Sequence, residues 1–552
     1  MVDHIVGRLA AHGVRHIFGV DGANIEDLYD AAHFDADLTA VLAKHEFSAA
    51  TMADGYRRSG EPLGVVAATS GGGSLNLVAA LGESLTSRVP VLALIGQPPT
   101  VLDGHGSFQD TSGLGGSLDA EALFSAVSVY CRRVVDPDTI DVVLTEALAA
   151  TRLGPAVLLL PKDVQQSHFG GESGAAAPFA APLGDPAPIA EQLRRVHGPV
   201  TIIAGEQVAR DDARDELERL RAILRARVAT VPDAKDTSGA PGLGSSSALG
   251  VTGVMGHPGV ADAIAAGAAC LLVGTRLPVT ARAGLDAALA AVPVLSLGAQ
   301  APHIPSMHVH TDDLRGSLSL LNAALSGPGR AAGVTVPEHI SHEELSPPAH
   351  DGSGIRYRAA MAALNRALPE GADIVVDAGN AGASAIHYLP VRRGGRFVVA
   401  LGMGGMGYSF GAGIGMCFAR GRRTVIIAGD GSFFMHGLEL HTAIQYRLPV
   451  TLVLFNNNAH AMCVTREQLF YQDLYSYNRF QPSNLGAGLA AMFPGLPAAD
   501  VTDIGALPQA LQTALTVEGP SVVSIECSAD EIPPFAPFLT TKEARTHVPA
   551  RT

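Results

Sequence analysis

Short apolar runs alternate with helix-like segments along most of the chain. Residues 424–429 (TVIIAG) and 450–455 (VTLVLF) are continuous apolar runs bounded by turn residues, as expected of strands buried on both faces of a parallel sheet. Residues 48–58 and 434–446 have the composition and length of the helices that connect such strands. The pattern therefore predicts an α/β fold of doubly wound parallel sheets.

The alternation occurs in three stretches, separated by two segments rich in Ala, Pro and Gly. With 552 residues, the chain is long enough for three domains. We expect a first domain over residues 1–165, a central domain over 188–326 and a last domain over 351–552. Residues 166–187 and 327–350 are the expected linkers.

Composition excludes several classes of partner. The chain is 47% hydrophobic and 16% charged, as in compact globular proteins, and its formal net charge of −15 disfavours nucleic acid and anionic membranes. Its 5 cysteines form no CxxC pair, which is typical of reduced cytosolic thiols. Residues 1–14 resemble neither a signal peptide nor an anchor, and no apolar run reaches the ~18 residues of a membrane span. We expect a cytoplasmic protein.

Polar residues follow two of the predicted strands. Gly429, Asp430 and Gly431 stand at the end of the run 424–429, and Asn457 follows the next run. Carboxylate and amide oxygens at one sheet edge suit Mg²⁺, which commonly also binds phosphate oxygens. Gly431 and the amide of Ser432, at the expected helix start, would then face a diphosphate. The alternative is a pair of ordinary tight turns.

Two motifs carry a resemblance to a known family. Asn457 stands 27 positions after Asp430 (457 − 430), and residues 45–76 read HEFSAATMADGYRRSGEPLGVVAATSGGGSLN. Both are similar to motifs of the thiamine-diphosphate (ThDP) enzymes of the pyruvate decarboxylase and acetolactate synthase superfamily, and the pattern is closest to acetolactate synthase large subunits. The resemblance implies a pyrimidine-binding first domain, a central Rossmann-like domain and a diphosphate-binding last domain. It also implies ThDP and Mg²⁺ as cofactors, with Asp430, Asn457 and the Ala459 carbonyl as metal ligands.

The same resemblance gives Glu46 a catalytic role. It identifies Glu46 as the carboxylate that hydrogen-bonds N1′ of the aminopyrimidine and favours the imino form of the 4′-amine, which then removes the C2 proton. The alternative is a surface glutamate stabilised by the dipole of the helix that follows.

Further cofactor contacts are implied in the last domain. Residues 373–385 (DIVVDAGNAGASA) resemble the segment whose turn residues grip the diphosphate, and residues 397–416 resemble the one that holds the pyrimidine. Met406 would bend the cofactor so that its 4′-nitrogen approaches C2, although Met is also a common core residue. The implied contacts are Asn380, Ala381, Gly382, the Gly404 carbonyl and Met406.

Other residues are candidates for substrate contact. Phe108 and Gln109 resemble a loop near the thiazolium, where Gln109 would donate to a substrate oxygen rather than being a plain loop residue. Ala23 and Thr69 stand where benzoylformate-decarboxylase-like enzymes carry an active-site Ser and His. The missing proton donors favour carboligation over simple decarboxylation.

Three more residues are candidates for substrate contact or chemistry. Arg276 stands where acetolactate synthases hold the acceptor carboxylate, but the FAD-associated pattern of their central domain is poor here, so FAD is not expected. The chain has no Trp, whereas those enzymes usually carry one near Arg466, which is instead a candidate carboxylate ligand. His460 is a candidate acid, base or oxyanion donor. His460 and Arg466 are equally compatible with solvated helix positions.

The resemblance predicts a reaction and an assembly. We expect a lyase that decarboxylates a 2-oxo acid and transfers the acyl carbanion equivalent to a second carbonyl compound. Alternatives are a decarboxylase that releases an aldehyde and a non-catalytic cofactor-binding subunit. In this superfamily Glu46 and Asp430 would serve one cofactor from different subunits, so a homodimer is the minimum unit, often doubled to a tetramer. Residues 531–550 are a candidate lid.

Overall fold

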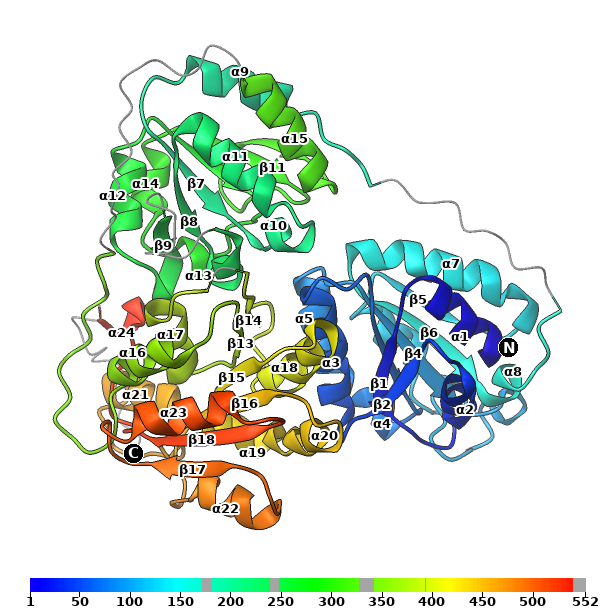
Figure 1. Cartoon of the computed structure of the whole chain (residues 1–552). Coiled ribbons are helices and arrows are strands. Elements are labelled where there is room, and N and C mark those ends of the chain that lie inside the picture. Colours follow the sequence, from blue (N-terminus) through cyan, green and yellow to red (C-terminus); the bar gives the residue numbers. More distant parts are fainter. Residues whose placement is uncertain (171–180, 239–247, 327–341, 393, 540–552) are drawn as a thin grey trace, which may run out of the picture.

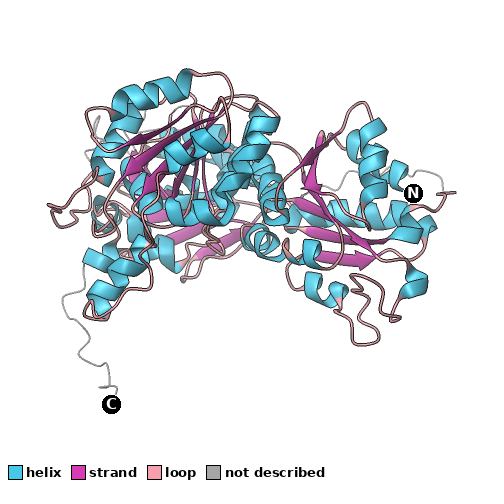
Figure 2. Ribbon diagram, turned by 90° about the horizontal axis from the view of Figure 1, so that it is seen from below, coloured by secondary structure: helices cyan, strands magenta, loops and turns pink. Residues whose placement is uncertain are grey.

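Three parallel six-stranded sheets, each covered by helices, make up the chain (Figures 1 and 2). The computed structural model describes residues 1–170, 181–238, 248–326, 342–392 and 394–539. The predicted α/β class with three doubly wound parallel sheets is confirmed. The exact domain bounds stay a prediction.

The first sheet has the order β2-β1-β3-β4-β6-β5. Its strands are β1 His16–Val20, β2 Thr39–Leu42, β3 Gly64–Ala68, β4 Val91–Gln97, β5 Tyr130–Arg133 and β6 Ala156–Pro161. Its helices are α1 Val2–Ala11, α2 Glu26–Phe34, α3 Glu46–Arg58, α4 Gly72–Leu75, α5 Val78–Thr86, α6 Ala120–Ser125, α7 Ile140–Ala150 and α8 Lys162–Gln165. Every residue of β3, β4 and β6 is buried, because helices cover both faces of the sheet. This explains their unbroken apolar sequences.

The second sheet has the order β12-β11-β10-β7-β8-β9. Its strands are β7 Val200–Ala204, β8 Arg227–Thr230, β9 Ala248–Val251, β10 Ala269–Val273, β11 Val294–Gly298 and β12 Met307–His310. Its helices are α9 Ala187–Arg195, α10 Glu206–Arg210, α11 Arg214–Leu224, α12 Gly259–Ala265, α13 Val279–Arg282, α14 Asp286–Ala290 and α15 Leu314–Leu325.

The third sheet has the order β14-β13-β15-β16-β18-β17. Its strands are β13 Asp373–Val376, β14 Phe397–Val399, β15 Thr424–Gly429, β16 Val450–Asn456, β17 Ala498–Val501 and β18 Ser521–Glu526. Its helices are α16 Tyr357–Ala367, α17 Asn380–Tyr388, α18 Tyr408–Arg420, α19 Asp430–His436, α20 Leu440–Gln445, α21 Ala461–Phe470, α22 Leu485–Met492, α23 Leu507–Thr516 and α24 Ala536–Leu539.

The first and last domains meet along α3 and α18, which lie side by side between the blue and yellow parts of Figure 1. Glycines allow this contact: a Cβ on Gly55 would lie 2.1 Å from the Ala412 carbonyl oxygen, and one on Gly415 would lie 2.0 Å from that of Met52. The two helix backbones therefore pack directly against each other.

One predicted element differs from the structure. The helix expected over 434–446 begins four residues earlier as α19, and a 3-10 turn at Gly437–Glu439 separates it from α20. Gly437 lowers helix stability, and a Cβ there would meet the Phe433 ring at 2.1 Å. The strand-end residues Asp430, Gly431 and Ser432 consequently lie in the first turn of α19 instead of before it.

The remaining features agree with the sequence patterns where they are described. Residues 181–186 and 342–350 contain neither helix nor strand, and the other parts of the expected linkers lie partly outside the described residues. All five cysteines are free. No helix in the described ranges has the length and apolar character needed to cross a membrane. The candidate lid lies outside the described residues from position 540 onward.

Candidate active site

The carboxyl ends of β15 and β16 bring together a strand-end cluster of Asp430, Gly431, Asn457 and Ala459. The two strands are parallel neighbours, with Gly429 opposite Phe455. Asp430 is 1% exposed, and its Oδ2 accepts a hydrogen bond from the Ala459 amide at 3.2 Å. Asn457 donates from Nδ2 to the Tyr357 hydroxyl at 3.1 Å.

This cluster fits a cation. Oδ1 of Asp430 and Oδ1 of Asn457 are both buried without a hydrogen-bond partner among the described residues. Buried polar atoms are rarely left unpaired, and two such oxygens at one strand edge are the donors that Mg²⁺ prefers. Burial raises the pKa of Asp430 to about 6, against the opposing effect of nearby backbone amides. A bound cation would favour the ionised carboxylate.

The first turns of α17 and α19 have the features of an anion-binding site beside this cluster. Helix α17 begins with Asn380, Ala381 and Gly382 after Gly379, whose φ is +94°. Asn380 donates to the Glu531 carbonyl at 3.3 Å, and its own Oδ1 is buried and unpaired in the described structure. The first turns of α17 and α19 present backbone amides, the usual contacts for phosphate oxygens.

Sequence reasoning missed Asp377, which organises this region. Its carboxylate accepts hydrogen bonds from the Ser432 hydroxyl at 2.6 Å, the Gly407 amide at 3.0 Å and the Ser409 amide at 2.9 Å. Asp377 therefore ties the start of α19 to the glycine turn before α18. Its position directly after a buried strand, like that of Asp430, was the available signal.

Met406 and His460 converge on Gly431. A Cβ added to Gly431 would lie 2.5 Å from His460 Nδ1 and 3.5 Å from Met406 Cε. His460 Nδ1 is buried and without a partner among the described residues. The ring packs edge-on against Phe480 at 4.7 Å, and the His460 amide donates to the Asn478 carbonyl. The structure thus directs His460 towards the strand-end cluster.

Glu46, Thr69 and Gln109 form a separate first-domain cluster. Glu46 begins α3, and its Oε2 accepts a hydrogen bond from Asn76 Nδ2 at 2.9 Å. A Cβ on Gly73 would lie 3.0 Å from Glu46 Oε1 and 2.9 Å from the Thr69 methyl group. The Thr69 hydroxyl lies 3.5 Å from Gln109 Oε1, and Gln109 has a left-handed φ of +60°. Such a φ is uncommon for a residue with a side chain and occurs often at functional sites.

The two clusters do not meet within one chain. Among the described residues, no hydrogen bond, ion pair or ring contact joins the first-domain cluster to the strand-end cluster. Asn24, which was not predicted, supports the first-domain cluster, because its backbone amide donates to the Thr69 hydroxyl at 3.3 Å.

Other predicted substrate residues lie away from both clusters or in solvent. Phe108 is 81% exposed, and Ala23 is exposed with its carbonyl accepting from Lys162 Nζ at 2.6 Å. Arg466 is exposed on α21 and has no hydrogen bond or ion pair in the part of the chain described. Its neighbour Glu467, in contrast, accepts a hydrogen bond from Asn478 Nδ2 at 2.7 Å.

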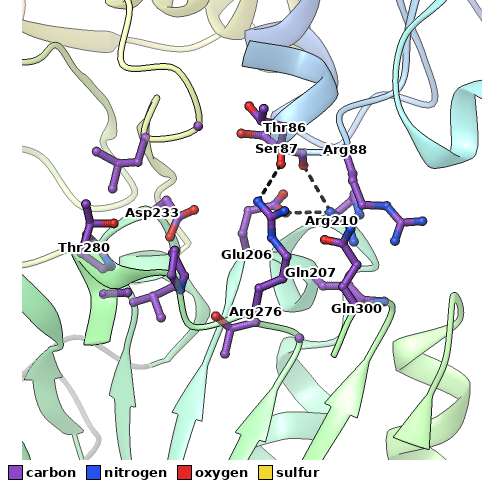
Figure 3. A pocket seen from close by; sticks show the side chains of 18 of the residues that line it. Thr86, Ser87, Arg88, Glu206, Gln207, Arg210, Asp233, Arg276, Thr280 and Gln300 are labelled. Carbon is purple, nitrogen blue, oxygen red and sulfur yellow. Dashed lines mark hydrogen bonds and ion pairs between the residues drawn. The ribbon is translucent and has the colours of Figure 1, made fainter. Parts of the chain in front are cut away.

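Arg276 lies in a different cavity, at the carboxyl edge of the second sheet (Figure 3). The cavity has a volume of about 180 Å³, below the roughly 300–1,000 Å³ of typical ligand pockets. Arg276 donates to the Thr86 carbonyl at 3.2 Å, and Arg210 donates to the Ser87 carbonyl at 3.4 Å and to Glu206 at 2.8 Å. These contacts join the central domain to the end of α5. The prediction that FAD is not bound stays a prediction.

Glu531 gives a pH-dependent prediction. Burial raises the pKa of its carboxyl from the ordinary 4.5 to about 7, although the Tyr357 amide donates to it at 3.1 Å. Because the folded state holds this proton more tightly, Glu531 makes the fold progressively less stable as pH rises from 4.5 to about 7. We expect Glu531→Gln to be more stable than wild type by roughly 1–2 kcal/mol at pH 8 and nearly equal at pH 4.5.

Urea unfolding of both proteins across this pH range measures the difference. A stability gap that stays constant with pH would contradict the assigned ionisation.

Known proteins share this architecture. Residues 1–115 match "Thiamine pyrophosphate enzyme, N-terminal TPP binding domain", and residues 377–525 match the corresponding C-terminal TPP binding domain. The chain is 28% identical to a probable acetolactate synthase large subunit of Methanocaldococcus jannaschii, over 97% of this chain and 93% of the relative. It is also 28% identical to the acetolactate synthase isozyme 2 large subunit of Escherichia coli, over 97% of this chain and 96% of the relative.

Solved structures show the same fold. Benzoylformate decarboxylase from Polynucleobacter necessarius superposes with a TM-score of 0.80 at 17% identity, covering 96% of this chain and 99% of that chain. A putative thiamin diphosphate-dependent enzyme from Mycobacterium smegmatis gives 0.76 at 20% identity, with 96% and 99% covered.

The two TPP binding domains and the three-sheet fold define the class: this chain is a thiamine-diphosphate-dependent enzyme. Within that class, its sequence is similar to acetolactate synthase large subunits over nearly its whole length.

Proposed function

We propose that this protein is a Mg²⁺-requiring carboligase that decarboxylates a 2-oxo acid and transfers the acyl unit to a second carbonyl compound, and that it acts in the cytoplasm. The observation that carries the cofactor assignment is the pair of buried, unpartnered oxygens on Asp430 and Asn457. Bound ThDP supplies the electron sink for decarboxylation next to a carbonyl group.

The chain's own groups have separate roles in this proposal. Asp430, Asn457 and the Ala459 carbonyl hold Mg²⁺, while the amides of the first turns of α17 and α19 bind the diphosphate. Met406 supports the cofactor from the side of Gly431. Glu46 holds a proton at N1′, and Gln109 orients a substrate oxygen beside it.

The proposal includes a homodimer as the smallest active unit. The first-domain cluster and the strand-end cluster share no contact within the described chain, and a second copy would supply the missing half of each site. Doubling to a tetramer is compatible with this arrangement, and size-exclusion chromatography with light scattering measures the state directly.

Carboligation is favoured because neither Ala23 nor Thr69 carries a titratable proton donor, and because the relatives include acetolactate synthases. The unpartnered Nδ1 of His460 facing Gly431 favours the second candidate, a decarboxylase that protonates its intermediate and releases an aldehyde.

Product analysis separates these two functions. Purified protein with saturating ThDP and Mg²⁺ is given a panel of 2-oxo acids including pyruvate, with and without an acceptor aldehyde or oxo acid, while CO₂ is measured. We expect CO₂ release together with a ligated product when an acceptor is present. Aldehyde as the sole product under every condition would contradict carboligation.

A further inference from the structure

A buried carboxylate of the first domain holds a turn of the last domain. Glu83, on α5, is 3% exposed. Its Oε2 accepts hydrogen bonds from the amides of Met403 at 2.6 Å and Gly404 at 3.3 Å, and its Oε1 accepts from the Gly402 amide at 3.2 Å. In the described structure these are the hydrogen bonds that the three amides donate. Three successive N–H groups therefore converge on one carboxylate.

Glu83 is itself held by a buried polar network. Its Oε1 also accepts from the Ser87 hydroxyl at 2.8 Å and from Arg58 at 3.4 Å. Arg58 donates to Asp54 at 2.6 Å, and Asp54 accepts from the Tyr408 hydroxyl as well. The network spans α3, α5 and α18. Because its carboxylates are paired with a guanidinium and several donors, the charge on Glu83 is compensated where it is buried.

The turn has little else to fix its shape. Gly402, Met403, Gly404 and Gly405 are all exposed, and Met403 is 59% exposed. A Cβ on Gly402 would lie 2.1 Å from the Thr86 hydroxyl, so the turn rests directly on the last turn of α5. Gly404 has a φ of +65° with open space around it. Glycine-rich backbone of this kind takes its orientation from its hydrogen bonds rather than from side-chain packing.

We propose that Glu83 is a positioning residue that aims the Gly404 carbonyl at the aminopyrimidine. This inference rests on the proposed function, in which that carbonyl accepts a hydrogen bond from the cofactor's 4′-amine. The same helix α3 begins with Glu46 and carries Asp54 and Arg58. In a dimer with shared sites, α3 thus presents Glu46 to one site while its other end stabilises the pyrimidine-binding turn of the second.

The test removes the charge of Glu83 and follows the turn directly. Glu83→Gln leaves one acceptor oxygen but sets an NH₂ group against backbone donors. In the cofactor-free full-length protein, we expect hydrogen exchange of the amides at 402–404 to accelerate at least about tenfold. In the presence of ThDP and Mg²⁺, we expect kcat to fall by about 100-fold, since a misplacement of about 1 Å has an effect of that order.

Matched variants separate positioning from folding. Asp373→Asn removes another buried carboxylate, which binds Arg420 at 2.8 Å and the Arg396 amide at 2.9 Å at the opposite edge of the last sheet. It should leave exchange at 402–404 and kcat within about twofold of wild type. Glu83→Asp keeps the charge on a shorter side chain and should give intermediate exchange and turnover, which covers the case in which Glu83→Gln folds poorly.

The outcomes are distinguishable. Wild-type exchange at 402–404 in both Glu83 variants would overturn the inference, as would equal acceleration in Asp373→Asn. If exchange accelerates while kcat stays at the wild-type value, the turn is held by Glu83 but its position does not serve the cofactor, which also overturns the inference. Failure of the wild-type protein to bind ThDP in calorimetry would instead contradict the proposed function.

Discussion

Glu46→Gln is expected to lower kcat by about 10²- to 10⁴-fold, the usual contribution of a positioned acid–base group. The glutamine side chain has the same shape but cannot hold the ionisable proton at N1′. The fold should be unaffected, because Glu46 is partly exposed and its one hydrogen-bond partner in the described structure is Asn76 Nδ2, at 2.9 Å. Steady-state kinetics at saturating ThDP and Mg²⁺, with an unfolding curve for each protein, give the measurement.

Glu61→Gln is the matched control for this variant. Glu61 also belongs to the first domain, and its carboxylate binds Arg15 at 2.8 Å on the surface. Its replacement should leave kcat unchanged. A Glu46→Gln protein with wild-type turnover would remove Glu46 from the catalytic cycle and would revive the alternative of a non-catalytic cofactor-binding subunit.

The fold was accessible from sequence because its strands are buried on both faces. Runs such as residues 424–429 and 450–455 are apolar throughout, and the structure places them as adjacent central strands β15 and β16. The strand-end cluster follows from the same pattern, since residues just after neighbouring parallel strands lie at one edge. The residues predicted to bind the metal and the diphosphate could therefore be recognised from the local sequence pattern alone.

Contacts between segments far apart in the chain could not be predicted from the local sequence pattern. Glu83 lies more than 300 positions before the turn that it holds, and nothing in the local pattern of α5 indicates a partner in the last domain. Asp377 could be identified from the sequence as a strand-end carboxylate. Its contacts with Ser432 and Gly407, however, depend on how α18 and α19 pack. The same limit applies to His460, which lies near Gly431 and packs against Phe480 in the loop between α21 and α22.

The α3–α18 contact couples the first domain to the last. Direct backbone packing at Gly55 and Gly415 fixes the first domain against the last. Residues next to Glu46 also pack on α19, since the Phe47 ring stacks on the His436 ring at 4.4 Å. In the proposed dimer, these contacts would set the arrangement of the two domains within each copy.

Asp430→Asn is expected to stabilise the cofactor-free protein and to reduce the stabilisation that the cofactor provides. In the cofactor-free protein at pH 8, wild-type Asp430 is an ionised carboxylate in a buried position, and its pKa is raised to about 6 from the ordinary 3.8. Because the folded state favours the protonated form, the ionised carboxylate destabilises the fold above pH 6. The Asn variant should therefore be more stable by about 1–3 kcal/mol at pH 8, and this difference should vanish below pH 3.8.

With Mg²⁺ and ThDP, this advantage of the Asn variant should shrink by at least about 1.4 kcal/mol. A ligand that binds only the folded state stabilises it by RT ln(1 + [L]/Kd), and replacing the charged oxygen ligand should weaken Mg²⁺-dependent ThDP binding by at least about 10- to 100-fold. At a ligand concentration about 1,000 times the wild-type Kd, the wild-type protein gains about 4 kcal/mol, and the variant gains at least about 1.4 kcal/mol less. Thermal and urea unfolding with and without Mg²⁺–ThDP test both halves. Equal stabilisation of the two proteins would show that Asp430 does not hold the metal, because the variant would then have lost no affinity.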